Sequence, residues 1–133
     1  MSESPTRTSS QAPGHSGQLA NDGNPATFWQ ADANDTNAWL RVDLERIVTV
    51  SQTRLMFPTD GNWRYKMEIS YDGETNWRLL ADQTQAISTS KERKDAVQNS
   101  SFRGRFVRIA IIGAPAEKVA AISEFTATGQ VAQ

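Results

Sequence analysis

The sequence contains no cysteine, so disulfide crosslinks, thiol nucleophiles and thiolate-held zinc or iron–sulfur centres are excluded. It has no marked excess of charge of one sign, because 14 Lys and Arg residues oppose 15 Asp and Glu residues. The formal charge of -1 argues against nucleic acid or an anionic membrane as a partner. No apolar run approaches the roughly 20 residues of a membrane span, and residues 1–17 contain no apolar segment typical of a signal peptide.

The residues that are present suffice for one folded domain. Hydrophobic residues make up 38% of the 133 residues and charged residues 22%, a balance typical of a globular chain. Residues 1–17 are rich in Ser, Pro and Gly, which predicts a flexible lead or linker. We therefore expect the domain to occupy residues 18–130 and to be one module of a longer protein.

The pattern of apolar residues predicts β-strands and little helix. Apolar and polar residues alternate over 39–44 and over 64–71, a period of two that is typical of half-buried strands. Residues 106–112 and 120–129 also favour strand. Asp-Gly pairs and prolines separate these segments, and no segment keeps apolar residues at helical spacing over several turns. The sequence thus predicts an all-β domain, either a sandwich or a barrel.

An oxygen-rich turn precedes the first long strand. Asp22, Asn24 and Thr27 cluster around an Asp-Gly turn, and Trp29 follows closely. Calcium takes six to eight oxygen ligands at about 2.3–2.6 Å, which such a turn supplies in part, and Glu124 would offer a second carboxylate if the two ends of the chain meet. The same residues also fit an Asx-type turn without metal, and spacing alone favours that alternative.

Five blocks in unbroken order resemble the discoidin domain, also called coagulation factor 5/8 type C. They are A-x-D-G-N-x-x-T-x-W (Ala20–Trp29), W-L-x-V-D-L (Trp39–Leu44), Y-K-x-E-x-S-x-D-G-x-x-x-W (Tyr65–Trp77), R-F-V-R-I (Arg105–Ile109) and I-S-E-F-x-x-x-G (Ile122–Gly129). The closest resemblance is to the bacterial carbohydrate-binding modules of family 32. The resemblance implies a β-sandwich of the jelly-roll type, which agrees with the strand pattern.

The resemblance also implies a structural calcium ion (Ca2+) at the oxygen-rich turn. Its ligands would be the backbone carbonyls of Ala20 and Asn24, the carboxylates of Asp22 and Glu124, and the carbonyl and hydroxyl of Thr27. The ion would hold the N-terminal loop against the last strand, a stabilising role and not a catalytic one. With the resemblance, calcium becomes the preferred interpretation of this turn.

Trp63 is the aromatic residue that we expect to bind ligand. It lies in a Pro- and Gly-containing loop between two predicted strands, where an exposed ring would stack on the C–H face of a sugar. Asp60, Asn62 and Arg64 flank it and would bind the hydroxyls. The alternative is that Trp63 folds back and caps the end of the sandwich. The other three tryptophans, Trp29, Trp39 and Trp77, are expected to fill the core.

A second loop, residues 30–37, is expected to form a wall of the same site. Family 32 modules place their ligand site on loops at one end of the sandwich, so Gln30, Asp35 and Asn37 are candidate ligand-binding residues. Residues 113–118 would form a third wall. Family members that bind galactose often carry a His in the first loop and an Arg before the Asn of the next. This chain has neither residue at these positions, because its histidine, His15, lies upstream of the first loop and Thr59 follows Pro58. The resemblance therefore does not extend to galactose specificity.

No pair of carboxylates and no Ser-His-Asp set indicates catalysis, so we expect no catalytic residues and a non-catalytic module. The resemblance implies a carbohydrate-binding module that targets a glycoside-active enzyme to a glycan, as a monomer in an extracellular or periplasmic bacterial protein. Two alternatives remain open: a protein- or phospholipid-adhesive discoidin domain, and a structural spacer without ligand. Lipid adhesion would require exposed apolar side chains with basic neighbours.

Overall fold

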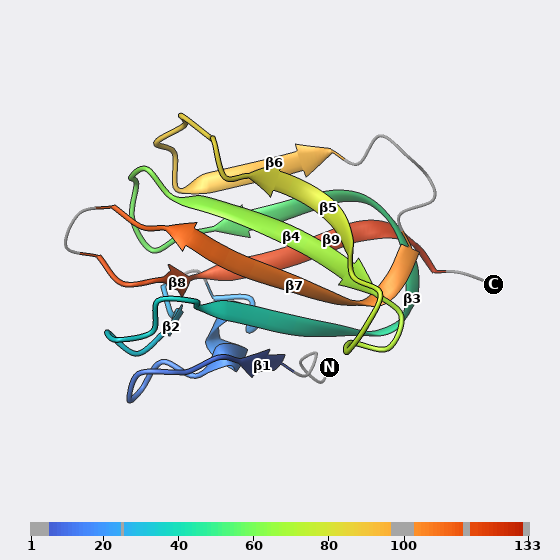
Figure 1. The fold of residues 1–133 in the computed structure, drawn as a ribbon, viewed down its shortest axis with the longest axis horizontal. Helices are drawn as coiled ribbons and strands as arrows, with labels where there is room; N and C mark the ends of the chain where they lie inside the picture. The colour runs from blue at the N-terminus through green and yellow to red at the C-terminus, as the bar shows by residue number, and fades with distance from the viewer. Residues whose placement is uncertain (1–5, 25, 97–102, 116–117, 132–133) are drawn as a thin grey trace.

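A computed structural model describes residues 6–24, 26–96, 103–115 and 118–131. Their regular secondary structure is almost entirely antiparallel strand (Figure 1). The strands are β1 (Thr6–Thr8), β2 (Trp29–Gln30), β3 (Trp39–Met56), β4 (Arg64–Ser70), β5 (Arg78–Gln83), β6 (Glu92–Ala96), β7 (Arg103–Gly113), β8 (Ala121–Ile122) and β9 (Glu124–Val131). The helical content of these residues is one 3-10 turn, η1 (Gly17–Ala20), and none of it could cross a membrane. The predicted all-β class is confirmed.

The strands form two layers that share β3. In the front layer the order is β1-β3-β7-β4-β5, and in the back layer β6 and β9 flank the second half of β3. The strand bends between Asp43 and Val48, where its register with β7 shifts. Glu45 adopts a positive φ of 70° there, and its backbone N–H donates to Oδ1 of Asp43 over 2.7 Å. The predicted β-sandwich of jelly-roll type is confirmed.

The core lies between the two layers and follows the period of two in each strand. On β4, Tyr65, Met67 and Ile69 point inward and are at most 1% exposed. The other large core side chains are Trp29, Leu40, Val42, Leu55, Phe57, Trp63, Ile109, Ile122 and Phe125. Each of the larger apolar side chains stabilises the fold by about 1.5–3 kcal/mol on burial.

The N-terminal segment differs from the flexible lead that its composition predicts. Residues Thr6–Thr8 pair with β3, with Thr6 opposite Val42. Ser10 accepts a hydrogen bond from the Trp29 indole through its backbone carbonyl over 2.9 Å. The Ser9 hydroxyl accepts the backbone N–H of Trp39 over 3.0 Å. The N-terminal segment is thus held against the sandwich by hydrogen bonds of its backbone and of a small polar side chain. Residues 1–5 of the predicted lead lie outside the described residues, and the exact domain boundary stays a prediction.

Four loops gather at one end of the sandwich, the left end in Figure 1: those that follow β2, β3, β5 and β7. Gly61 in the second loop donates its N–H to the carbonyl of Thr89 in the third over 2.8 Å. Gly61 also lies so close to Pro115 in the fourth that an added Cβ would meet the Pro115 Cβ at 3.0 Å. The loop end is therefore a packed structure, and the candidate site residues lie on it.

Candidate functional site

The structure places Trp63 in the core, which corrects the expectation of an exposed ring. Its side chain is 1% exposed and stacks in parallel on Phe57, with ring centroids 4.6 Å apart. The indole N–H donates to the carbonyl of Thr59 over 2.9 Å, so the loop folds back over the ring. A sugar cannot stack on a ring that is almost fully buried. Trp63 is therefore the cap at the end of the sandwich that the sequence analysis gave as the alternative.

The neighbours of Trp63 lie at different depths. Asp60 is exposed, but its Oδ1 accepts the backbone N–H of Lys91 over 2.9 Å and so fixes the next loop. Asn62 is exposed beside it. Arg64 is half-buried at the start of β4, on the outer face of the sheet, and its buried Nε has no hydrogen-bond partner among the described residues. These side chains therefore do not converge on Trp63.

The second predicted loop reaches open hollows. Asn37 is exposed and lines one of them, and Asp35 lines another. Asp35 accepts the hydroxyls of Ser9 and Ser10 at 2.6 and 2.7 Å, and these hydrogen bonds lower the pKa of its carboxyl. Gln30 lies in β2, where its backbone pairs with Ala121, and is half-buried. Asp35 is thus both a wall of a hollow and the anchor of the N-terminal segment.

The hollow that Asp35 lines, which we call the end hollow, lies between the loop after β2 and the loop after β7. It measures about 170 Å³. Polar groups on its rim come from Asp35, Thr36 and Lys118, and apolar surface comes from Ile112 and Val119. Hollows lined by both apolar side chains and a few polar groups are typical of small-ligand sites.

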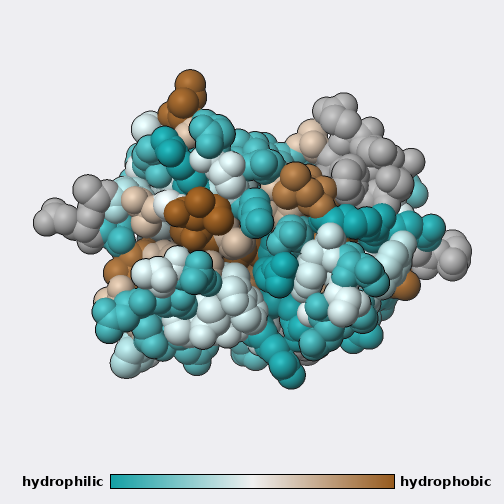
Figure 2. Space-filling model, viewed as in Figure 1, coloured by the Kyte–Doolittle hydropathy of each residue, from teal (hydrophilic) through white to brown (hydrophobic). Residues whose placement is uncertain are grey.

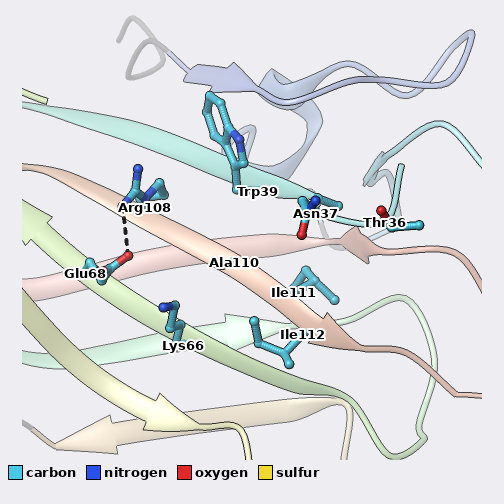
Figure 3. A pocket seen from close by; sticks show the side chains of 10 residues that line it. Thr36, Asn37, Trp39, Lys66, Glu68, Arg108, Ala110, Ile111 and Ile112 are labelled. Atoms are coloured by element: carbon cyan, nitrogen blue, oxygen red, sulfur yellow. Dashed lines mark hydrogen bonds and ion pairs between the residues drawn. The ribbon is translucent and has the colours of Figure 1, made fainter. Parts of the chain in front are cut away.

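The second hollow, which we call the face hollow, lies on the outer face of the front layer and measures about 350 Å³ (Figure 3). Its floor is Ala110 on β7, which pairs with Trp39 on one side and with Lys66 on the other. Arg108 and Glu68 line it further along the sheet, joined by an ion pair of 3.0 Å. The two hollows adjoin, since both are lined by Thr36, Ala38, Ile111 and Ile112.

The surface over this region is mixed in polarity. Figure 2, seen from the same side as Figure 1, shows apolar surface where β7 ends and strongly polar surface along the middle of the sheet. Ile112 is 55% exposed at the junction of the two hollows. Apolar and hydrogen-bonding groups therefore alternate over a short distance.

Trp39 is the site residue that the sequence analysis missed. We expected it in the core with Trp29 and Trp77, but only Trp29 is fully buried, at 0% exposure. Trp39 and Trp77 are half-buried on the outer face. The alternation of β3 carries the signal: Leu40 and Val42 point inward, so Trp39 must point outward.

The oxygen-rich turn lies against the start of β9. Asp22 accepts the backbone N–H of Asn24 through Oδ1 at 2.9 Å and the hydroxyl of Thr27 through Oδ2 at 2.6 Å. Glu124 accepts the backbone N–H of Gly23 through Oε2 at 3.2 Å, which brings the two predicted carboxylates to one region. Ala20, which precedes the turn, is fully buried. The described residues contain no group of three or more acidic or His side chains that would hold a metal.

Comparison with known families identifies the domain. The model of the F5/8 type C domain matches residues 5–125, so the chain belongs to the F5/8 type C (discoidin) family. No curated protein matches the chain.

Several solved structures share the fold, at identities that show the fold alone. The module CpGH89CBM32-6 of Clostridium perfringens is 20% identical, with a TM-score of 0.80 over 97% of this chain and 95% of that chain. CpGH89CBM32-4 of the same organism, solved with GlcNAc-α-1,4-galactose, is 21% identical, with a TM-score of 0.79 over 93% and 88%. The family 32 module of C. perfringens NanJ, solved with galactose, is 20% identical, with a TM-score of 0.79 over 92% and 91%.

Proposed function

We propose that this domain is a non-catalytic carbohydrate-binding module that binds a glycan in the end hollow. The observation that carries the proposal is the end hollow itself, which is lined by polar side chains from two loops and by apolar Ile112 and Val119. A sugar ring presents the matching chemistry, with C–H groups on its face and hydroxyls at its edge. Support comes from the modules of the same fold that were solved with galactose or GlcNAc-α-1,4-galactose.

The carboxylates near the hollows argue for binding rather than hydrolysis. A glycosidase needs one carboxylic acid with a raised pKa as proton donor and a second carboxylate facing it. Hydrogen bonds from Ser9 and Ser10 lower the pKa of Asp35, the opposite of what a proton donor requires. Glu68 is held by Arg108. Neither residue is placed to protonate a leaving group.

An accessory role in a larger enzyme is part of this proposal. The chain also matches 14% of the length of a family 89 glycoside hydrolase of C. perfringens, with a TM-score of 0.80 and 23% identity. By analogy, the domain would hold a parent enzyme close to its polysaccharide, outside the cell or in the periplasm, and raise the local substrate concentration.

A glycan array followed by calorimetry tests the sugar site. Thr36→Ala and Lys118→Ala each remove one polar group of the exposed rim. Each should weaken glycan binding about fivefold, the loss expected for one hydrogen bond. Gln130→Ala, an exposed change on β9, is the control and should bind as the wild type does. Absence of any glycan ligand, or full affinity in both rim variants, would contradict the proposal.

We further propose that the oxygen-rich turn binds calcium. Its donor set, the carboxylates of Asp22 and Glu124 with the oxygens of Asn24 and Thr27, consists of the hard oxygen ligands that calcium prefers. The ion would join the turn to β9 and stabilise the folded state by mass action.

Thermal unfolding with and without calcium tests this site. Addition of calcium to chelator-treated protein should raise the Tm, because the ion binds only the folded state. The shift should be absent in Asp22→Asn. An equal shift in that variant, or no shift in the wild type, would leave the turn as an Asx-type turn without metal.

A second candidate function, adhesion to a phospholipid surface, is favoured by one observation. Ile87 is 92% exposed in the loop after β5, at the same end as the hollows. A single apolar side chain supplies only about 1.5–3 kcal/mol, which is weak anchoring. Sedimentation with anionic liposomes separates the candidates: lipid adhesion requires binding that Ile87→Asp abolishes.

A further inference from the structure

The outer face beside the face hollow carries two cationic side chains on β4, Arg64 and Lys66. Arg64 and Lys66 point to the same face of β4, because inward-facing Tyr65 lies between them. Among the described residues, neither side chain has an ion pair within 4.0 Å. Arg64 also keeps its buried Nε without a hydrogen-bond partner there.

Nearby acidic groups already have partners. Glu68 pairs with Arg108, whose guanidinium also packs on the ring of Trp77 at 4.2 Å from the centroid. Asp82 lies opposite Lys66 on β5, and its Oδ1 accepts the backbone N–H and the hydroxyl of Thr84, at 3.0 and 2.7 Å. These hydrogen bonds and, to a smaller extent, the charge of Lys66 lower the pKa of the Asp82 carboxyl, but the two side chains form no ion pair within 4.0 Å. The cations Arg64, Lys66 and Arg108 thus border this face, and Glu68 is the carboxylate among the residues that line the hollow.

Trp39 supplies a surface that suits a sugar ring. It stands on the β3 side of the hollow, across the Ala110 floor from Lys66 (Figure 3). It is half-buried, and its indole N–H donates no hydrogen bond to the described residues. Since Ala110 has a small side chain, the space between Trp39 and Lys66 stays open. An aromatic wall, a shallow floor and a facing lysine therefore meet in one place.

We propose that the face hollow binds an anionic sugar unit, so that the ligand is an acidic glycan that continues from the end hollow across Ile112 onto the sheet. This inference rests on the proposed function, since the end hollow holds the neighbouring unit of the same chain. The sugar ring lies against Trp39, and its carboxylate or sulfate faces Lys66, which lines the hollow. Arg64, two residues earlier on the same face of β4, adds positive charge beside the hollow. Exposed Ile112, which lines both hollows, offers the glycan an apolar contact between them.

Calorimetry with three oligosaccharides of equal length tests the proposal: an oligo-uronate, a sulfated galactan and a neutral galactan. The wild type should prefer an anionic chain, and added salt should reduce the preference because the contacting charges are partly exposed. Lys66→Gln should weaken anionic binding about tenfold, the loss expected for one charge-assisted hydrogen bond. The uronate and sulfate arms distinguish the two sources of negative charge.

Matched variants keep the result interpretable. Lys94→Gln removes an exposed lysine of β6 in the back layer and should retain the full preference. Trp39→Ala should weaken every chain that reaches the face hollow. If it folds poorly, Trp39→Phe keeps a ring and should retain most of the affinity. Arg64→Gln should reduce the anionic preference in the same direction as Lys66→Gln.

The outcomes separate this inference from the proposed function. Equal affinity for neutral and anionic chains in the wild type would overturn the inference and leave the sugar-binding proposal intact. An anionic preference that survives both Lys66→Gln and Arg64→Gln would overturn it as well. A domain that binds none of the three chains and no other glycan would contradict both.

Discussion

Arg93 joins two loops of the site end through one buried guanidinium. The side chain of this β6 residue is 7% exposed, and it donates to the carbonyls of Ser90, Trp63, Gly61 and Ser88 at 2.6 to 3.2 Å. It also lies over the Phe57 ring, 5.6 Å from the centroid. A planar fork with five N–H groups suits carbonyls that lie in several directions.

Arg93→Lys should therefore destabilise the domain although it keeps the charge. A single ammonium cannot reach all of these carbonyls, and each unmet buried group costs about 1–3 kcal/mol. We expect a total loss of about 2–4 kcal/mol in urea unfolding. Lys94→Arg, the exposed neighbour, should change stability by less than about 0.5 kcal/mol. Similar stability of the two variants would show that the carbonyl network contributes little.

The tryptophans show how much of the candidate site the sequence predicts. The inward–outward alternation along each strand places them correctly. Trp63 is two residues before inward-facing Tyr65 and so also points inward, whereas Trp39 is next to inward-facing Leu40 and so points outward. An interpretation from loop position and family blocks put Trp63 outside and Trp39 inside, the reverse of the structure. Local periodicity was the better guide: Trp63, one residue before β4, still packs in the core, and Trp39, the first residue of β3, already follows the alternation of that strand.

At the scale of elements, β9 depends on close backbone contact with β3. Gly129 pairs with Val50 next to a register shift, and an added Cβ would lie 2.8 Å from the carbonyl carbon of Thr49 and 3.0 Å from the Cα of Val50. These are backbone atoms of a central strand, so they cannot move aside as a flexible side chain would.

Gly129→Ala should thus separate part of β9 from β3 and lower the Tm by several degrees, the shift that a loss of about 1–2 kcal/mol gives in a domain of this size. Gly113→Ala is the matched control, because the nearest atom to its added Cβ is 3.6 Å away. Hydrogen exchange of the β9 amides would locate the effect. Unchanged protection of β9 in Gly129→Ala would contradict this account.

The elements also show where prediction from sequence stops. The strand segments and the all-β class follow from period-two alternation, which is a local property. The face hollow requires Trp39, Ala110 and Lys66 to pair across three strands, and this register arises from tertiary packing of distant segments. The sequence therefore predicts the architecture and the loop end, and it cannot predict which side chains border a hollow.

For the whole molecule, the carboxylates make stability depend on pH. Hydrogen bonds from Arg105 lower the pKa of Asp43, those from Ser9 and Ser10 lower the pKa of Asp35, and backbone N–H groups of Thr75 and Glu74 lower the pKa of Asp72. Each carboxyl is therefore a stronger acid in the folded state than in the unfolded state.

The sign follows from this difference. The stabilisation is complete above the unfolded-state pKa of about 3.9 and is lost as the pH falls through the lower folded-state values. The Tm should stay nearly constant between about pH 7 and pH 5 and fall steeply below about pH 4. Asp43→Asn should flatten the fall, which calorimetry over this range measures. A fall of unchanged steepness in the variant would mean that the Asp43–Arg105 pair contributes nothing to it.

The strand β3, 18 residues long, is an inner member of both layers of the sandwich. The first half of β3 pairs with β7, and the second half pairs with β6 and β9. Separation of β3 from β7 would therefore also disturb the strand on which β6 and β9 depend. Neither layer can therefore peel away while the other stays assembled, and denaturation becomes an all-or-none event. The loop end that holds the two hollows consequently keeps its shape until the entire domain is lost.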